Sequence, residues 1–250
     1  MKILGLDSSG IVASVAIVED ENLIAEYTVN YKKTHSQTLL PMLDELVKMT
    51  ELDLDTIDAI AVAAGPGSFT GLRIGSATAK GLGLALEKPL ISIPTTAAIA
   101  YNIWDTNKFV CPIMDARRNQ VYTGVYCYTD HRLDTVWEQD TMSIEALAEG
   151  LNCLDHEVIF LGDGVAVYRE KLEALLTIPF SFAPAHVNRQ RAAAVGALAE
   201  VYYKEGKIQT AEEHEPEYLR KSQAERERAE RESVKHADVV KKQENGEKSE

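Results

Sequence analysis

Acidic and hydroxyl side chains that could hold a phosphate or a metal ion lie at the ends of three apolar runs of this sequence. They are Asp7 with Ser8 and Ser9, Asp115, and Gly162 with Asp163. Ligands of open α/β sheets bind at the carboxyl ends of the strands, so these residues could line one cleft. The residues at 7–9 could equally do no more than satisfy the backbone groups of a tight turn.

A glycine-rich segment, GPGSFTGLRIG at 65–75, follows the apolar run 57–64. Glycine permits positive φ and proline fixes φ, so the chain should turn here and enter a helix capped by Ser68 or Thr70. This helix should end before Pro89. The turn could cradle a phosphate at the helix N-terminus. We favour a packing role, because neither a P-loop motif nor GxGxxG follows the strand.

Small residues recur every four positions in the predicted helix, at Gly71, Gly75, Ala79 and Gly83. They form one stripe without large side chains, although each interior glycine costs roughly 1 kcal/mol of helix stability relative to alanine. The stripe therefore predicts a very close neighbour, either within this chain or on a partner.

No recognisable catalytic set accompanies these residues. The six histidines occur singly, and the sequence contains no HExxH, HxxxH or GxSxG motif. His35 lies just before a helical pattern and has Leu39 four positions on. We therefore favour a capping or surface role for His35 over metal binding.

Apolar periodicity predicts two similar α/β halves that would position the residues named above. The first half should contain three strands, a helix, a strand, a helix and a strand, and the second should repeat three strands, a helix and a strand. In the second half we expect a strand from Val136 and a short helix over 144–149. A last amphipathic helix is predicted over 185–205, ended by Gly206.

The composition limits the classes of protein that the chain can represent. With 250 residues, 45% of them apolar, it can form a substantial core. A net charge of −13 argues against direct binding of nucleic acid. The three cysteines lack CxxC spacing, which fits reduced thiols in a cytoplasmic protein. No apolar run approaches the roughly 18 residues of a membrane span, so we expect none.

These patterns predict four parts of the chain. They are a first lobe over 1–104, a smaller α/β lobe over 105–184, a C-terminal helix and extension over 185–220 that packs back on the lobes, and a charged tail over 221–250. The tail holds eight acidic and eight basic residues and few apolar ones, so we expect it to be mobile.

The chain resembles the bacterial TsaB (YeaZ) family in four stretches. They are MKILGLDSS at 1–9, HSQTLLPML at 35–43, AVAAGPGSFTGLRIGSATAKGLGLAL at 61–86 and EPEYLR at 215–220. The resemblance covers about residues 1–220 and implies a two-lobed, actin-like (sugar kinase/Hsp70-type) α/β fold. It also implies a role in adding threonylcarbamoyl to N6 of adenosine 37 in tRNAs that read ANN codons.

In that family the protein is a non-catalytic, dimerising subunit. The resemblance implies that the related subunit TsaD transfers the group and holds a metal through an HxxxH pair, while the ATPase TsaE joins the complex. His35 and Leu39 cannot supply that pair. We therefore expect a heterodimer with TsaD and tRNA contact only through the complex; the sequence leaves open whether the chain forms a homodimer without TsaD. We expect no cofactor on this chain, and any ATP or ADP would belong to the complex.

The family's two N-terminal helices meet TsaD in a four-helix interface, which the resemblance carries to particular positions. They are His35, Leu39, Leu43 and Leu46 on the first helix, and Gly71, Ile74, Gly75, Thr78 and Leu82 on the second. Alternatively, the small stripe packs against the chain's own sheet. The competing function is an actin-like ATPase or phosphotransferase that acts alone through Asp7, Ser8 and Ser9, with the cleft otherwise a vestige.

Overall fold

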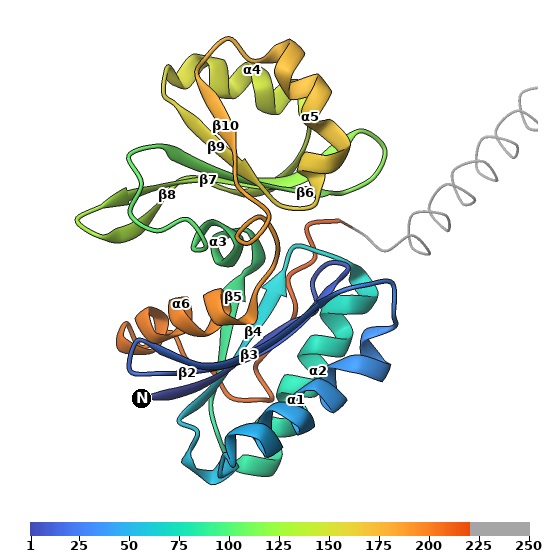
Figure 1. The fold of residues 1–250 in the computed structure, drawn as a ribbon, viewed down its shortest axis with the longest axis vertical. Coiled ribbons are helices and arrows are strands. Elements are labelled where there is room, and N and C mark those ends of the chain that lie inside the picture. The colour runs from blue at the N-terminus through green and yellow to red at the C-terminus, as the bar shows by residue number, and fades with distance from the viewer. Residues whose placement is uncertain (221–250) are drawn as a thin grey trace, which may run out of the picture. The chain divides into compact units, whose positions relative to one another are not determined.

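Two five-stranded sheets form the framework of residues 1–220, the part of the chain that this computed structural model describes (Figure 1). The first sheet has the order β3-β2-β1-β4-β5, and the second has the order β10-β9-β6-β7-β8. The strands of the first sheet are β1 (Lys2–Asp7), β2 (Val12–Glu19), β3 (Asn22–Asn30), β4 (Ala59–Gly65) and β5 (Leu90–Pro94). Those of the second are β6 (Phe109–Asp115), β7 (Gln120–Thr129), β8 (Arg132–Ser143), β9 (Val158–Leu161) and β10 (Phe180–Phe182).

The helices follow equivalent strands in the two halves of the sequence. They are α1 (His35–Thr50), α2 (Phe69–Leu86) and α3 (Thr95–Ala100) in the first, and α4 (Ile144–Leu154), α5 (Gly164–Leu175) and α6 (Ala192–Lys204) in the second. A short 3-10 helix, Leu54–Thr56, precedes β4. In each sheet three consecutive strands pair antiparallel, and two later strands add in parallel. The predicted duplication of an α/β unit is therefore confirmed.

The second half is more complete than the sequence pattern predicted. Helix α5 and strand β10 were missed, β8 begins at Arg132 rather than at Val136, and α4 continues to Leu154. Helix α6 begins at Ala192, seven residues later than predicted. Residues 185–191 form turns, bends and irregular backbone instead. Gly206, with φ of 74°, lies just beyond the end of α6, as its predicted capping role requires.

The apolar core consists of three clusters that follow the layers of the fold. The first lies between the first sheet and helices α1 and α2, and the second lies between α3, α6 and both sheets. The third lies between the second sheet and helices α4 and α5. Figure 1 shows α1 and α2 on one face of the first sheet and α6 on the opposite face. None of the helices within 1–220 is long and apolar enough to cross a membrane.

The small-residue stripe of α2 faces the chain's own sheet. A Cβ atom added at Gly71 would lie 2.0 Å from the backbone oxygen of Ser8, and one at Gly83 would lie 2.3 Å from Leu90 Cδ1. Ala79 belongs to the core cluster beneath the helix. The alternative in which the stripe packs within the chain is thus the one that the structure shows.

The chain divides into Met1–Tyr218 and Leu219–Glu250. The predicted lobe boundaries at 104/105 and 184/185 stay predictions, because both sheets belong to the first of these units. The predicted mobile tail at 221–250 lies outside the described residues.

The α2 stripe generates a matched pair of stability predictions. Gly71→Ala should lower the free energy of unfolding by about 1–3 kcal/mol, because the new methyl group meets backbone that cannot move aside. Gly81→Ala, on the open face of the same helix, has no atom within 4 Å of the new Cβ. It should raise the free energy by up to about 1 kcal/mol through helix propensity alone. Urea unfolding followed by circular dichroism measures both, and equal stabilisation of the two variants would contradict the packing.

Candidate functional site

The turn after β1 lies beneath the first turn of α2, and its side chains are buried. Asp7 Oδ1 accepts hydrogen bonds from Ser9 N at 2.8 Å and Ser9 Oγ at 2.7 Å. Ser8 Oγ donates to the backbone oxygen of Gly71 at 2.8 Å. Ser68 N donates to the backbone oxygen of Ser9 at 2.7 Å, while the Ser68 side chain caps the helix as predicted. The hydroxyl groups of this turn are therefore used by the protein itself.

Three buried polar atoms around this turn have no hydrogen-bond partner: Asp7 Oδ2, His35 Nδ1 and Gln190 Nε2. The other ring nitrogen of His35 lies 2.8 Å from the backbone oxygen of Gly10, so the histidine ties α1 to the turn. Burial raises the pKa of Asp7 to about 6, although the bonds from Ser9 and the nearby His35 act in the opposite direction. Asp7 therefore takes up its proton at a higher pH than an exposed aspartate does.

The corresponding end of the second sheet carries the other predicted cleft residues. Asp115 Oδ1 accepts bonds from Arg117 N at 2.9 Å and Tyr168 OH at 3.2 Å. Asp163 is mostly buried, and its Oδ1 has no partner. Burial raises the pKa of Asp163, and the guanidinium of Arg189 opposes that shift. The structure therefore brings Asp115, Gly162 and Asp163 together.

Residues 189–191 run between these two groups. Arg189 donates to the backbone oxygen of Gly162 at 2.8 Å, and the Gln190 side chain lies against Gly10. Within 1–220, no recorded hydrogen bond or ion pair joins Asp7 directly to Asp163. The hydroxyl groups of Ser8 and Ser9 already donate to Gly71 and Asp7, whereas Gln190 Nε2 beside Gly10 has no partner. The turn therefore offers a nucleotide phosphate no free hydroxyl donor.

The predicted partner residues on α1 and α2 differ in how far this chain itself covers them. Five are buried in the chain's own core or against its own turn: Leu39, Leu43, Leu46, Gly71 and Gly75. The apolar period of a helix marks the face that its own sheet covers, so these five point inward. The others, His35, Ile74, Thr78 and Leu82, are half-buried, and their contact with a partner stays a prediction.

The outer face of the same two helices carries different residues. Leu40, Pro41 and Met49 are exposed on α1, and Ala77 and Gly81 are exposed on α2. In sequence, these exposed residues lie between the buried positions of each helix. That spacing is the one feature from which the sequence could have indicated the outer face, since the residue types themselves are ordinary.

The EPEYLR segment, which the sequence pattern placed in an extension that packs back on the lobes, contacts α2, β4 and the second sheet. Glu217 N donates to the backbone oxygen of Ala64 at 2.7 Å, and Gln139 of β8 donates to Glu217 at 2.6 Å. The Tyr218 ring lies 4.6 Å from the ring of Phe69 at the start of α2. Arg73 covers the same Phe69 ring at 4.2 Å and donates to Tyr218 OH at 3.3 Å.

The chemistry of a metal centre is also not assembled. Across residues 1–220, no three histidine, cysteine, aspartate or glutamate side chains are grouped closely enough to hold a metal ion. The site is therefore a closed turn surrounded by unpartnered buried polar atoms.

The burial of Asp7 predicts a pH-dependent contribution to stability. Because its folded pKa lies above the unfolded value, folding takes up a proton between about pH 4 and 6, and stability falls as the pH rises through that window. Asp7→Asn should be spared this loss. Its advantage over the wild type should grow by about 2–3 kcal/mol between pH 4 and pH 7. Urea unfolding at both pH values measures this, with exposed Asp44→Asn as the control. A pH-independent difference between Asp7→Asn and the wild type would contradict the burial effect.

Comparison with known proteins now places this architecture. The family model TsaD: tRNA N6-adenosine threonylcarbamoyltransferase matches residues 22–228. The tRNA threonylcarbamoyladenosine biosynthesis protein TsaB of Bacillus subtilis (strain 168) is 31% identical over 225 residues, covering 90% of this chain and 96% of the relative. The protein of the same name from Escherichia coli (strain K12) is 30% identical over 232 residues, covering 90% of this chain and 96% of the relative.

A solved structure shows the same fold. YeaZ from Pseudomonas aeruginosa superposes with a TM-score of 0.76 at 26% sequence identity, covering 87% of this chain and 99% of that one. The fold is therefore the two-lobed, actin-like α/β fold, as predicted. Family model, sequence relatives and structure agree over nearly the whole length of the relatives, and the chain belongs to the TsaB (YeaZ) family, related to TsaD.

Proposed function

We propose that this chain acts in the synthesis of tRNA threonylcarbamoyladenosine, as a non-catalytic subunit that binds and activates a TsaD-type threonylcarbamoyltransferase. The observation that carries the proposal is the match to TsaB proteins of that pathway along 96% of their length. The assembly would work in the cytoplasm, modify adenosine 37 of tRNAs that read ANN codons, and include the ATPase TsaE. This chain would contact tRNA only through the complex.

The closed turn supports a role without catalysis. The hydroxyls of Ser8 and Ser9 and one oxygen of Asp7 are held in internal hydrogen bonds, so they are not free to bind a substrate. His35 is also occupied, because its ring bonds to the backbone of Gly10. A subunit with such a turn would contribute through its surface.

The outer face of α1 and α2 is the surface that suits a TsaD-type partner. The two helices pack against each other on one face of the first sheet (Figure 1). On α2 the outward positions Ala77 and Gly81 are small, which lets a partner helix approach closely. On α1, Leu40 and Met49 supply exposed apolar area on opposite flanks of the helix, since nine positions are about two and a half turns. The same face would serve a homodimer when the partner is absent.

The heterodimer generates a test in which the fold is preserved. Gly81→Arg puts a long charged side chain on the outer face, where no atom lies within 4 Å of the new Cβ, and arginine is a better helix former than glycine. The cognate TsaD should bind this variant at least about tenfold more weakly, because an unpaired charge buried in an interface costs more than 1.4 kcal/mol.

Size-exclusion chromatography with light scattering measures the complex. Val167→Arg, at an exposed apolar position of α5 on the other sheet, is the matched control and should bind like the wild type. If Gly81→Arg bound TsaD with wild-type affinity, the outer face of α2 would not be the interface. A failure of the wild type to bind TsaD would overturn the proposed function itself.

An ATPase or phosphotransferase that acts alone is the competing function. It is favoured by two buried, unpartnered carboxylate oxygens, Asp7 Oδ2 at the end of β1 and Asp163 Oδ1 just after β9. We propose instead that this chain turns over no nucleotide and that ATP or ADP belongs to the complex. Hydrolysis assays with Mg-ATP on the chain alone should show no turnover. Turnover by the wild type that is lost in Asp7→Ala would transfer the function to this chain.

A further inference from the structure

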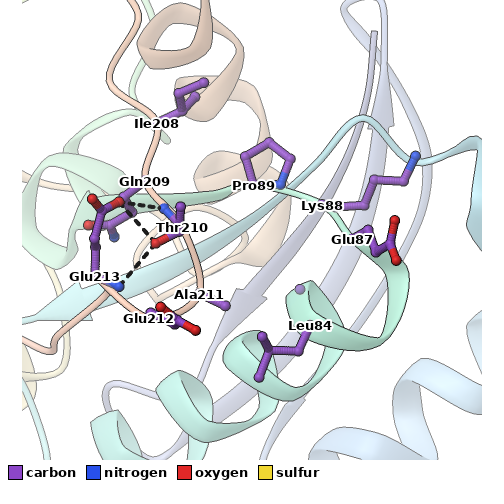
Figure 2. A pocket seen from close by; sticks show the side chains of 11 residues that line it. Leu84, Glu87, Lys88, Pro89, Ile208, Gln209, Thr210, Ala211, Glu212 and Glu213 are labelled. Carbon is purple, nitrogen blue, oxygen red and sulfur yellow. Dashed lines mark hydrogen bonds between the residues drawn. The ribbon is translucent and has the colours of Figure 1, made fainter.

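A groove of about 580 Å³ lies at the C-terminal end of α2, away from the turn after β1 and next to Gly81 on the outer face of the helix. One wall is formed by the last turn of α2 and the residues that lead into β5, and the other is formed by residues 208–213 (Figure 2). Binding sites for small molecules and peptide side chains have volumes of this order. The groove is therefore large enough to take two or three side chains of a partner.

The groove has an apolar lining at its opening. Leu84 of α2 is 62% exposed and Ile208, from the opposite wall, is 47% exposed. Pro89 and Ala211 continue the apolar surface between them. Exposed aliphatic side chains that line one groove gain free energy when an apolar group covers them.

Negative charge surrounds this apolar surface. Glu87 projects from one side of the groove, while Glu212 and Glu213 lie on the other (Figure 2). The carbonyl end of α2 adds the negative end of a helix dipole. Hydrogen bonds from Thr210 lower the pKa of Glu213, so its carboxylate stays ionised. The one lysine of the lining, Lys88, donates a hydrogen bond from its ammonium group to the backbone oxygen of Asp55 at 3.0 Å.

The backbone of the groove is already paired. Gln209 exchanges hydrogen bonds with Leu90, at 2.8 Å and 2.9 Å, and so covers the edge of β5. Thr210 N donates to Glu213, and His214 N donates to the backbone oxygen of Thr210. A partner cannot add a strand here, so its side chains must hold it.

We propose that this groove docks a basic, amphipathic helix of a protein partner. Aliphatic side chains of that helix enter between Leu84 and Ile208, and its lysine or arginine side chains pair with the glutamates around them. This is the helix-in-groove mode of recognition, with the charge of the partner chosen by the acidic surroundings. Leu84 shares the outer face of α2 with Gly81, but the inference does not rest on the proposed function, because its test uses a model helix and no TsaD.

Fluorescence anisotropy with the full-length chain tests the groove. The probe is a fluorescein-labelled model helix of leucine and lysine, and its counterpart has glutamate in place of lysine. The basic probe should bind at physiological ionic strength, and the acidic counterpart should not. Equal binding of the two probes would overturn the charge complementarity.

Charge-reversal variants separate the groove from the acidic surface as a whole. Glu87→Lys with Glu212→Lys should weaken binding of the basic probe by about tenfold, since two attractions become repulsions. Glu149→Lys with Glu170→Lys makes the same change in net charge at exposed positions of α4 and α5 and should leave the affinity near that of the wild type. Equal weakening by both pairs would mean that the probe binds the acidic surface without a site, and would overturn the proposal.

Neutral variants test the apolar part of the groove. Leu84→Ser with Ile208→Ser should also weaken the probe by about tenfold, because each side chain loses apolar contact area without a change in charge. Val167→Ser, at a similarly exposed position of α5, should have no effect. Circular dichroism confirms that each variant is folded. Unchanged binding of the Leu84→Ser/Ile208→Ser variant would show that the groove is not the binding site.

Discussion

The close approach of α2 to the turn after β1 is the constraint on which the rest of the structure depends. At Gly67, Gly71 and Gly75 there is no room for a side chain, because oxygen atoms of Ser8 and Ser9 lie where a Cβ would be. This contact brings the start of α2 down onto the end of β1. It buries the hydroxyls of the turn, fixes which face of α2 meets the sheet, and leaves Ala77 and Gly81 on the other face. This one close contact therefore limits the groups that the turn leaves free for a ligand, and it determines which face of α2 is exposed to a partner.

The closed turn supports the proposal that this actin-like fold acts without nucleotide turnover of its own. A fold of this type positions a turn at the end of its first strand, but function depends on the groups that the turn leaves free. Here the side chain of Ser9 is hydrogen-bonded to Asp7, that of Ser8 to the backbone of Gly71, and that of His35 to the backbone of Gly10. The remaining polar atoms are buried without partners rather than presented to a ligand. The proposed non-catalytic role requires only that the scaffold hold its helices in place.

Much of this fold could be predicted from the sequence, and the failures have identifiable physical reasons. Short apolar runs indicate buried strands well, so the sequence pattern predicts the duplicated order of strands. Strand β10 was missed because it has three residues, all only half-buried. The glycine stripe correctly indicated a close neighbour, but periodicity identifies a helix face and not what covers it. The bonds of Gln139 to Glu217 and of Arg189 to Gly162 join residues far apart in the chain. No local pattern contains such pairs.

The charge of the chain fits a protein that works on RNA through other proteins. Since the eight acidic and eight basic residues of 221–250 cancel, the whole excess of −13 belongs to residues 1–220. Such a surface repels a phosphate backbone but attracts the basic surfaces of proteins that bind one. The acidic groove at the end of α2 is a local instance of this, because its glutamates surround exposed Leu84 and Ile208. If tRNA contacts only the complex, as proposed, the acidity that disfavours tRNA on this chain would also help to select its protein partners.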